Sequence, residues 1–312
     1  MQPVVPCPAI GNKPGHLFGF VSSVVDGLLL LSDERVVVDP PLVGRHHVTV
    51  VPVRGSPIKH IDVADCNLSE MGFKKSLQKV KDFKISPQLI KDYESKRNFP
   101  SQDATSRLGP HLRFGTVSIR EMVKKAISEP NEIFWQELIW REFFMQILWH
   151  FPYTTSKSFK PKYDRIVWRN NELEFKSWCE GKTGYPLVDA GMRQLNETGF
   201  MHNRVRMLVG SFLCKHLLID WRWGEAYFAE KLHDYEMASN IGNWQWVAGC
   251  GVDAAPYFRI FNPTTQIEKF DKNLEYIKKW VPDFLELSYP KPIVDQKLAR
   301  DRCLNTYKQA IN

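Results

Sequence analysis

One long segment without glycine or proline constrains the fold more than any other part of this sequence. It reads NEIFWQELIWREFFMQILWHF and runs from Asn131 to the residue before Pro152. Its apolar residues, among them Ile133, Phe134 and Leu138, recur at the spacing of a helix. Asn131 is a favourable N-cap, and proline cannot continue a helix. The segment therefore predicts a long α-helix and favours an all-α domain.

Helical patterns occupy the chain from about Ile61 onward. The clearest are SIREMVKKAI, in which Ser118 and Glu121 match a capping box, and LVDAGMRQLNETG, NRVRMLVGSFLCKHLLI, GEAYFAEKLHDY and PQLIKDYESKR. Residues 1–60 differ, because they hold 8 of the 20 prolines and neither Trp nor Tyr. Their valine-rich runs, RVVVDPPLVG and HHVTVVPV, predict short strands or irregular segments. We therefore expect an unassigned N-terminal segment, residues 1–60, and a helical domain, residues 61–312.

Composition limits the class of protein without identifying it. Of the 312 residues, 43% are apolar and 25% are charged, which is usual for a globular protein in water. The net charge of +7 suits an anionic partner such as nucleic acid, although many proteins without one are as basic. Six scattered cysteines and no secretory signal pattern predict reduced thiols in a cytoplasmic protein. The run from Val24 to Leu31 is too short to cross a membrane, and the His46–His47 pair lacks further metal ligands.

Tryptophan is distributed unevenly. All ten tryptophans lie between Trp135 and Trp280. A large helical core would explain them, because indoles bury much apolar area. A planar ligand or base held by stacking, or a chain of redox-active rings, would explain them equally well. The sequence contains neither a GxGxxG nor a GxxxxGK[ST] loop, so a Rossmann or P-loop nucleotide site is not expected.

Two helical segments bring polar and aromatic groups onto one face. Glu137, Trp140 and Arg141 stand at positions i, i+3 and i+4. A surface ion pair between Glu137 and Arg141 is the plain interpretation, but an indole on the same face argues against a fully solvated stripe. In MHNRVRM, Asn203 and Met207 share a face in the same way.

Longer strings identify a family. DYESKRNFP, TSRLGPHLRFGTVSIR, ELIWREFF, GYPLVDAGMRQLNETGFMHNRVRM and DYEMASNIGNWQWVAGCGVDAAPYFRIFNPTTQIEKFD occur in this order. Through them the chain strongly resembles the DNA photolyase/cryptochrome flavoproteins, and specifically the photolyases that repair cyclobutane pyrimidine dimers. The resemblance covers about residues 61–308. It implies a helical FAD-binding domain that repairs dimer-containing DNA by electron transfer from photoexcited reduced FAD. We expect a monomer without a bound metal.

The resemblance assigns roles position by position. It implies FAD contacts for Tyr93, Thr105, Ser106, Arg107, Leu108, Arg141, Arg206, Asp234, Glu236 and Asn240. It implies a lesion pocket of Glu137, Trp140, Asn203, Met207 and Trp246, and phosphate contacts for Arg204, Arg259 and Lys269. It implies an electron-transfer chain of Trp244, Trp221 and Trp168. Glu137, Asn203 and Asn240 are the polar residues expected to act in catalysis, with Glu137 donating a hydrogen bond in its protonated form.

Asn203 and residues 1–60 refine the assignment. Asn203 follows His202 where photolyases for the (6-4) lesion carry a His pair, so dimer repair is favoured. Residues 1–60 are too short for the family's α/β domain, so an antenna chromophore (folate or deazaflavin) is not expected. Two alternatives stay open, namely a cryptochrome-like photoreceptor without repair activity and a truncated remnant that binds flavin or DNA without turnover.

Overall fold

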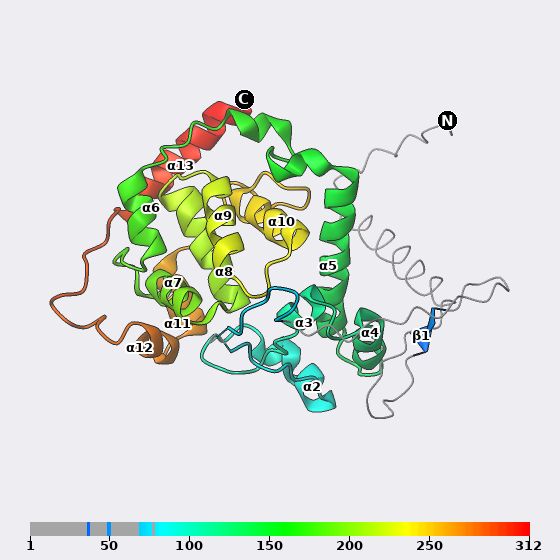
Figure 1. Ribbon diagram of the computed structural model, residues 1–312. Helices are drawn as coiled ribbons and strands as arrows, with labels where there is room; N and C mark the ends of the chain where they lie inside the picture. The colour runs from blue at the N-terminus through cyan, green and yellow to red at the C-terminus, as the bar shows by residue number, and fades with distance from the viewer. Residues whose placement is uncertain (1–35, 38–48, 51–68, 77–78) are drawn as a thin grey trace, which may run out of the picture. The chain divides into compact units, whose positions relative to one another are not determined.

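The computed structural model describes residues 36–37, 49–50, 69–76 and 79–312, and the chain divides into two units, Met1–Lys79 and Val80–Asn312 (Figure 1). In the first unit, strand β1 (Val36–Val37) pairs antiparallel with β2 (Thr49–Val50). Both strands fall within the valine-rich runs for which the sequence predicts strands or irregular structure. The boundary predicted after residue 60, like the His46–His47 pair, lies outside the described residues and stays a prediction.

The second unit is helical throughout, which confirms the predicted fold class. Its α-helices are α2 (Pro87–Lys96), α3 (Gly109–Arg113), α4 (Ile119–Ile127), α5 (Glu132–His150), α6 (Glu172–Cys179), α7 (Pro186–Thr198), α8 (Asn203–Ser211), α9 (Trp221–Lys231), α10 (Met237–Ala248), α11 (Pro263–Phe270), α12 (Glu275–Trp280) and α13 (Gln296–Ile311). Two 3₁₀ turns, η1 (Pro152–Thr155) and η2 (Pro161–Arg165), follow α5, and a π-helical turn, η3 (Phe212–His216), continues α8.

The helix starts follow the capping residues of the sequence. The side chains of Ser118 and Asn131 accept hydrogen bonds from backbone amides in the first turns of α4 and α5. Pro87 occupies the first position of α2, which is the first helix among the described residues. Residues 69–76 and 79–86 form no helix, and the predicted start of helical structure at about Ile61 lies outside the described residues.

The main core surrounds α8 and η3, which occupy the centre of the unit between α7, α9 and α10 (Figure 1). The fully buried side chains of Met192, Val209, Phe212 and Leu213 represent this core. The sequence predicts one helix from 203 to 219, whereas the structure changes from α to π geometry at Phe212 and ends the helix at His216.

Helix α5 connects this core to a second, smaller one. On one side it packs with α2 and α4 around Ile90, Met122 and Phe134. On its other side α5 packs against α10, and Phe143 and Phe144 of α5 form a buried cluster with Ala238 of α10. Two cavities, described below, lie beside the contact between α5 and α10.

Candidate functional site

Two adjoining cavities lie where α5, α8 and α10 meet. The outer cavity has a volume of about 330 Å³ and the inner one about 110 Å³. Five residues line both and form the wall between them, namely Asn203, Met207, Ser239, Asn243 and Trp246. Two cavities that share five lining residues can hold two ligands next to each other.

The outer cavity collects every residue that the sequence assigns to the lesion pocket, namely Glu137, Trp140, Asn203, Met207 and Trp246. Arg141, which the sequence assigns to the cofactor, also lines it, and its Nη2 donates to the carbonyl of Leu112 at 3.4 Å. The ring of Trp140 is held edge-to-face against Phe143, with centroids 5.3 Å apart. Two indoles and several amide or carboxyl groups in one cavity suit a flat, hydrogen-bonding ligand.

Glu137 has a partner that the sequence does not reveal. Its Oε1 lies 2.5 Å from Nη1 of Arg97, a residue at the end of α2. The predicted alternative, a pair with Arg141 one turn away, is therefore replaced by a pair between two helices. The Glu137 side chain is 37% exposed and faces the Arg97 guanidinium. The protonated form of Glu137 that the resemblance implies stays a prediction.

The inner cavity is lined by four of the ten residues predicted to contact the cofactor. Arg206, Asp234, Glu236 and Asn240 line it together with Trp244. Arg206 donates through Nη2 to both carboxylate oxygens of Asp234, at 2.8 and 3.2 Å, and through Nε to the carbonyl of Met201 at 2.7 Å. These bonds fix a partly buried ion pair in the cavity wall.

Glu236 also has a local structural function. Its carboxylate accepts hydrogen bonds from the backbone amides of Ala238 and Ser239 and so caps the N-terminus of α10. A carboxylate in this position is stabilised by the helix dipole. Glu236 therefore orients α10 whether or not it contacts a ligand.

The amide of Asn240 is oriented by Glu225, which the sequence analysis did not single out. Nδ2 of Asn240 donates to the backbone carbonyl of Glu225 at 3.1 Å and to its Oε1 at 3.0 Å. Because both amide hydrogens meet acceptors, Oδ1 is the group that Asn240 can offer to a ligand in the inner cavity. A carbonyl oxygen in that position can accept a hydrogen bond from a ring N–H.

The loop from Thr105 to Leu108 lies beside the ion pair of the inner cavity. A Cβ on Gly109 would come within 2.7 Å of Cβ of Asp234, so the backbone of this loop runs directly against that residue. Arg107 adopts a left-handed conformation, pairs with Asp103 at 3.0 Å and stacks 3.7 Å above the Phe200 ring.

Two neighbours of Arg107 in the sequence, and Tyr93 of α2, have local contacts of their own. The backbone carbonyl of Ser106 accepts a hydrogen bond from the amide of Lys84, and Leu108 is buried. Tyr93 packs edge-to-face on Phe134 in the smaller core. These three therefore hold the loop and its surroundings in place.

Arginines surround a buried histidine near this loop. His202 is 4% exposed, and burial, together with the charges of Arg107, Arg206 and Arg204, lowers its pKa to about 4. Its Nδ1 accepts from the amide of Arg204, while Nε2 is buried without a partner among the described residues. His202 itself lines none of the three cavities, but the guanidinium groups around it concentrate positive charge beside the Thr105–Leu108 loop, which favours an anion there.

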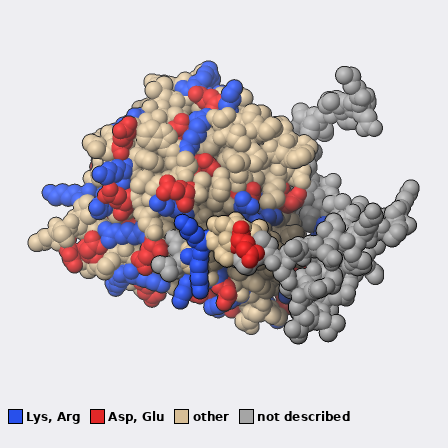
Figure 2. Space-filling model, viewed as in Figure 1, with Lys and Arg blue, Asp and Glu red and all other residues tan. Residues whose placement is uncertain are grey.

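The predicted phosphate contacts fall in two places. Arg204 and Lys269 meet at Phe270, with the guanidinium 4.4 Å and the ammonium 5.3 Å from the ring centroid, and Arg204 also donates to Asn98. Arg259 is exposed on the loop after α10, and its carbonyl accepts from the buried Lys215 ammonium at 2.8 Å. Figure 2 shows basic and acidic side chains interspersed on the face in view, so the positive charge on that face is confined to small areas.

The three tryptophans predicted for electron transfer differ in burial. Trp244 and Trp221 are buried, and Trp168 is half-buried with its ring 6.1 Å from that of Tyr307. Trp244 contacts Trp178 edge-to-face at 6.2 Å, and Trp178 is fully buried. Trp178 is an indole that the sequence analysis did not include in the chain, because only the fold brings α6 next to α10.

The described residues contain neither a candidate membrane-spanning helix nor a candidate metal-binding cluster. None of the described helices combines the length and the apolar character needed to span a bilayer. Over the same residues, no group of three or more His, Cys, Asp or Glu side chains is arranged to hold a metal ion. The predicted monomeric state and cellular location stay predictions.

Comparison with known proteins identifies what this architecture resembles. Residues 134–288 match the family model described as the FAD-binding domain of DNA photolyase. The chain is 44% identical over 247 residues to a deoxyribodipyrimidine photo-lyase of Vibrio cholerae, covering 71% of this chain and 53% of that protein. The chain thus spans about half the length of such relatives.

Solved structures give the same result. A class III photolyase from Agrobacterium tumefaciens is 45% identical with a TM-score of 0.68, over 71% of this chain and 53% of that one. A cryptochrome from Synechocystis is 32% identical with a TM-score of 0.63, over 70% of this chain and 52% of that one. The helical unit is therefore shared by repair enzymes and by cryptochromes.

Proposed function

The helical unit of this chain is an FAD-binding domain of the DNA photolyase family, and from this premise we propose that the chain repairs cyclobutane pyrimidine dimers in DNA in a light-dependent reaction. The observation that carries the proposal is the pair of adjoining cavities with one shared wall. The inner cavity has the residues for a flavin, and the outer cavity has those for a damaged base pair.

The polar residues of the inner cavity suit the flavin ring of FAD. The Arg206–Asp234 pair and Oδ1 of Asn240 supply hydrogen-bonding groups for that ring, and the positive charge of Arg107, Arg204 and Arg206 beside the Thr105–Leu108 loop would attract the pyrophosphate. Reduced FAD, when bound and excited by blue light, supplies the electron that splits the cyclobutane ring. The task of the protein is to hold the two ligands in contact through the shared wall of Asn203, Met207 and Trp246.

The outer cavity fits a flipped pyrimidine dimer. Its volume of about 330 Å³ lies within the usual range for ligand pockets, about 300–1,000 Å³. Trp140 and Trp246 offer indole faces on which an extruded base can stack, and a dimer is easier to extrude than intact bases because its pairing is already disturbed. Asn203 and Glu137 can hydrogen-bond the pyrimidine edges.

The Arg97–Glu137 ion pair would affect how a pyrimidine binds in the outer cavity. Glu137 is held by Arg97 at 2.5 Å, so a pyrimidine that bonds to Glu137 either shares the carboxylate with Arg97 or displaces it. Sharing keeps the Arg97 charge beside the electron-accepting dimer. We therefore include Arg97 among the residues that hold the lesion.

We assign these functions to the helical domain, residues 61–312, and none to residues 1–60. On this proposal FAD is the only chromophore of the chain. The action spectrum for repair should then follow the absorption of bound reduced FAD. A second absorption band that drives repair would contradict this part of the proposal.

The test is repair of a dimer-containing oligonucleotide by the purified, chemically reduced chain under blue light. Loss of the dimer in the light and not in the dark supports the proposal. FAD binding with no repair would favour a photoreceptor related to the cryptochromes or a remnant without turnover, and a photoreceptor would still respond to light in its flavin spectrum. A folded chain that cannot be loaded with FAD would refute the repair enzyme and the photoreceptor, and would leave a remnant that binds DNA alone.

A further inference from the structure

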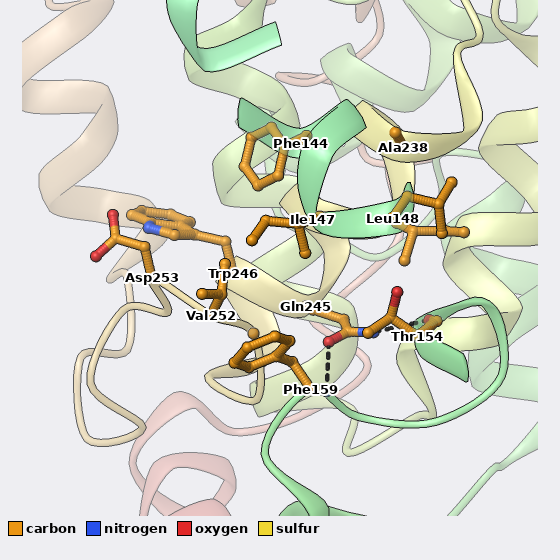
Figure 3. Close-up of a pocket in the computed structure, with 13 residues that line it drawn as sticks. Phe144, Ile147, Leu148, Thr154, Phe159, Ala238, Gln245, Trp246, Val252 and Asp253 are labelled. Carbon is orange, nitrogen blue, oxygen red and sulfur yellow. Dashed lines mark hydrogen bonds between the residues drawn. The ribbon is translucent and has the colours of Figure 1, made fainter. Parts of the chain in front are cut away.

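Gln245 occupies a special place in α10, between Trp244 of the inner cavity and Trp246 of the shared wall. Its side chain is 2% exposed and makes three hydrogen bonds to backbone atoms of one loop. Nε2 donates to the carbonyls of Thr154 and Lys157, both at 3.0 Å, and Oε1 accepts from the amide of Phe159 at 2.8 Å. All hydrogen-bonding groups of this amide face the loop 154–159, as Figure 3 shows for Thr154 and Phe159.

The backbone of the same residue holds a second segment. The carbonyl of Gln245 accepts from the amides of Gly249, Cys250 and Gly251, at 3.0, 3.0 and 3.1 Å. The carbonyl of Trp246 accepts from Ala255 at 3.2 Å. Gln245 thus ties both the loop 154–159 and the turn that follows α10 to the helix that carries Trp246.

These two segments form the back of the Trp246 site. A small apolar pocket of about 20 Å³ lies behind the indole, lined by Trp246, Phe159 and Val252 together with Ile147 and Leu148 of α5 (Figure 3). It is too small for a ligand and is a packing seam. Three residues line both this seam and the outer cavity, namely Phe144, Trp246 and Asp253. Whatever widens the seam gives the indole room to leave the lesion pocket.

We propose that Gln245 is a positioning residue that fixes the Trp246 indole for stacking by closing the seam behind it. The claim that the indole is fixed concerns this chain's own packing, and its consequence for damaged DNA rests on the proposed function. A glutamine suits the task because its amide presents donors and an acceptor to one loop at once. An apolar residue of the same length would leave two carbonyls and one amide of the loop without partners, and buried backbone groups seek other partners by moving.

The first experiment measures the indole directly and needs neither FAD nor DNA. The ten tryptophans of the full chain are labelled with 5-fluorotryptophan, and the ¹⁹F signal of Trp246 is assigned by its loss in Trp246→Phe. In Gln245→Met we expect this signal to shift or broaden, because the indole samples more than one orientation. If Gln245→Met does not fold, Gln245→Glu, which keeps the acceptor for the Phe159 amide, carries the same measurement.

Asp189→Asn is the matched control. Asp189 is also fully buried and also ties a loop to its helix, through Thr183, Gly184 and Tyr289, but it lies in α7 and lines none of the three cavities. It should lower the unfolding temperature without moving the Trp246 signal. If both variants moved that signal, the effect would be general loosening and the inference would be wrong.

The second experiment measures the consequence for binding. The ratio of affinities for dimer-containing and undamaged oligonucleotide should fall about tenfold or more in Gln245→Met and stay unchanged in Asp189→Asn, since one aromatic stack on a base accounts for a factor of this size. An unchanged ratio and an unchanged fluorine signal in a less stable Gln245→Met protein would leave Gln245 a purely structural residue. If the wild-type chain repairs no dimers while the fluorine signal moves, the proposed function fails and the positioning role stands.

Discussion

Replacing Gly224 with alanine should displace the indole of Trp244, which lines the inner cavity. Gly224 lies on α9, where it faces α10. A Cβ at this position would come closer than 3.0 Å to two atoms of the Trp244 ring and would lie 2.6 Å from Cδ2 of Leu213. Real Cβ atoms essentially never show such separations, so the ring or the helix has to move.

The size of the effect follows from the surroundings of the ring. Carbon atoms in contact prefer about 3.5–4.0 Å, so the indole must retreat by roughly 1.5–2 Å. Trp244 and Leu213 are both buried, and Trp178 and Phe228 pack against the indole, so the ring can move most readily toward the inner cavity that it lines. Overpacking of this kind costs about 1–3 kcal/mol, and at about 2–4 °C per kcal/mol the unfolding temperature should fall by roughly 2–12 °C.

A double-mutant cycle assigns the cost to the right pair. Unfolding by urea is measured for Gly224→Ala, for Trp244→Phe and for the two together. Phenylalanine is smaller than tryptophan, so it should accommodate the added methyl group, and the double variant should be more stable than the sum of the single effects predicts. A coupling energy of about 0.5–3 kcal/mol is typical for residues in contact.

The outcome that would refute this reasoning is additivity. If the two free-energy changes simply add, the added methyl group does not press on Trp244, and the helices have separated instead. A Gly224→Ala protein as stable as the wild type would show that α9 and α10 adjust without cost. The photoreduction of bound flavin gives a second readout, because a displaced Trp244 should donate electrons less efficiently.

Three further predictions address electron transfer, DNA binding and pH. Trp168→Phe should block photoreduction of oxidised flavin while repair by pre-reduced protein survives; retained photoreduction would direct attention to Trp178, which touches Trp244. Arg259→Ala should weaken binding to damaged and undamaged DNA alike and reduce its salt dependence, whereas Trp140→Ala should lower the preference for the dimer by about 1–3 kcal/mol; equal losses on both DNAs would contradict stacking. Burial, helped by the charges of Lys215 and Arg302, lowers the pKa of His216 to about 4. Between pH 6.5 and 4 the unfolded chain therefore binds a proton that the folded chain does not. The free energy of unfolding should decrease as the pH is lowered through this range, by up to about 1.4 kcal/mol per pH unit. His216→Phe should flatten this loss in urea unfolding at pH 7 and pH 5, and an unchanged slope would contradict it.

The sequence predicts the helices well because their signals are local. Ser118 and Asn131 cap the helices that they are expected to cap. The turn from α to π geometry at Phe212 has no such signal, since the same residues continue an α-helical pattern. It depends on how the central helix packs against its neighbours.

The site is predicted in part, and the missing parts share one cause. Helical spacing and the family strings bring Glu137 and Asn240 to the cavities. The partners that orient them, Arg97 and Glu225, come from other helices, α2 and α9. A sequence pattern specifies which face of a helix a residue occupies, but it does not specify which helix meets that face. Partners across helices therefore had to come from the structure.

Three consecutive residues of α10 illustrate how the fold adds meaning to the pattern. Successive side chains on a helix point about 100° apart, so Trp244, Gln245 and Trp246 must face three different surroundings. In the structure Trp244 faces the core and the inner cavity, Gln245 faces the loop 154–159, and Trp246 forms the wall of the outer cavity. In the sequence the two tryptophans stand out and the glutamine does not. Yet both the electron-transfer role proposed for Trp244 and the stacking role proposed for Trp246 require that α10 stay in place, and Gln245 is a buried side chain that ties α10 to the loop 154–159.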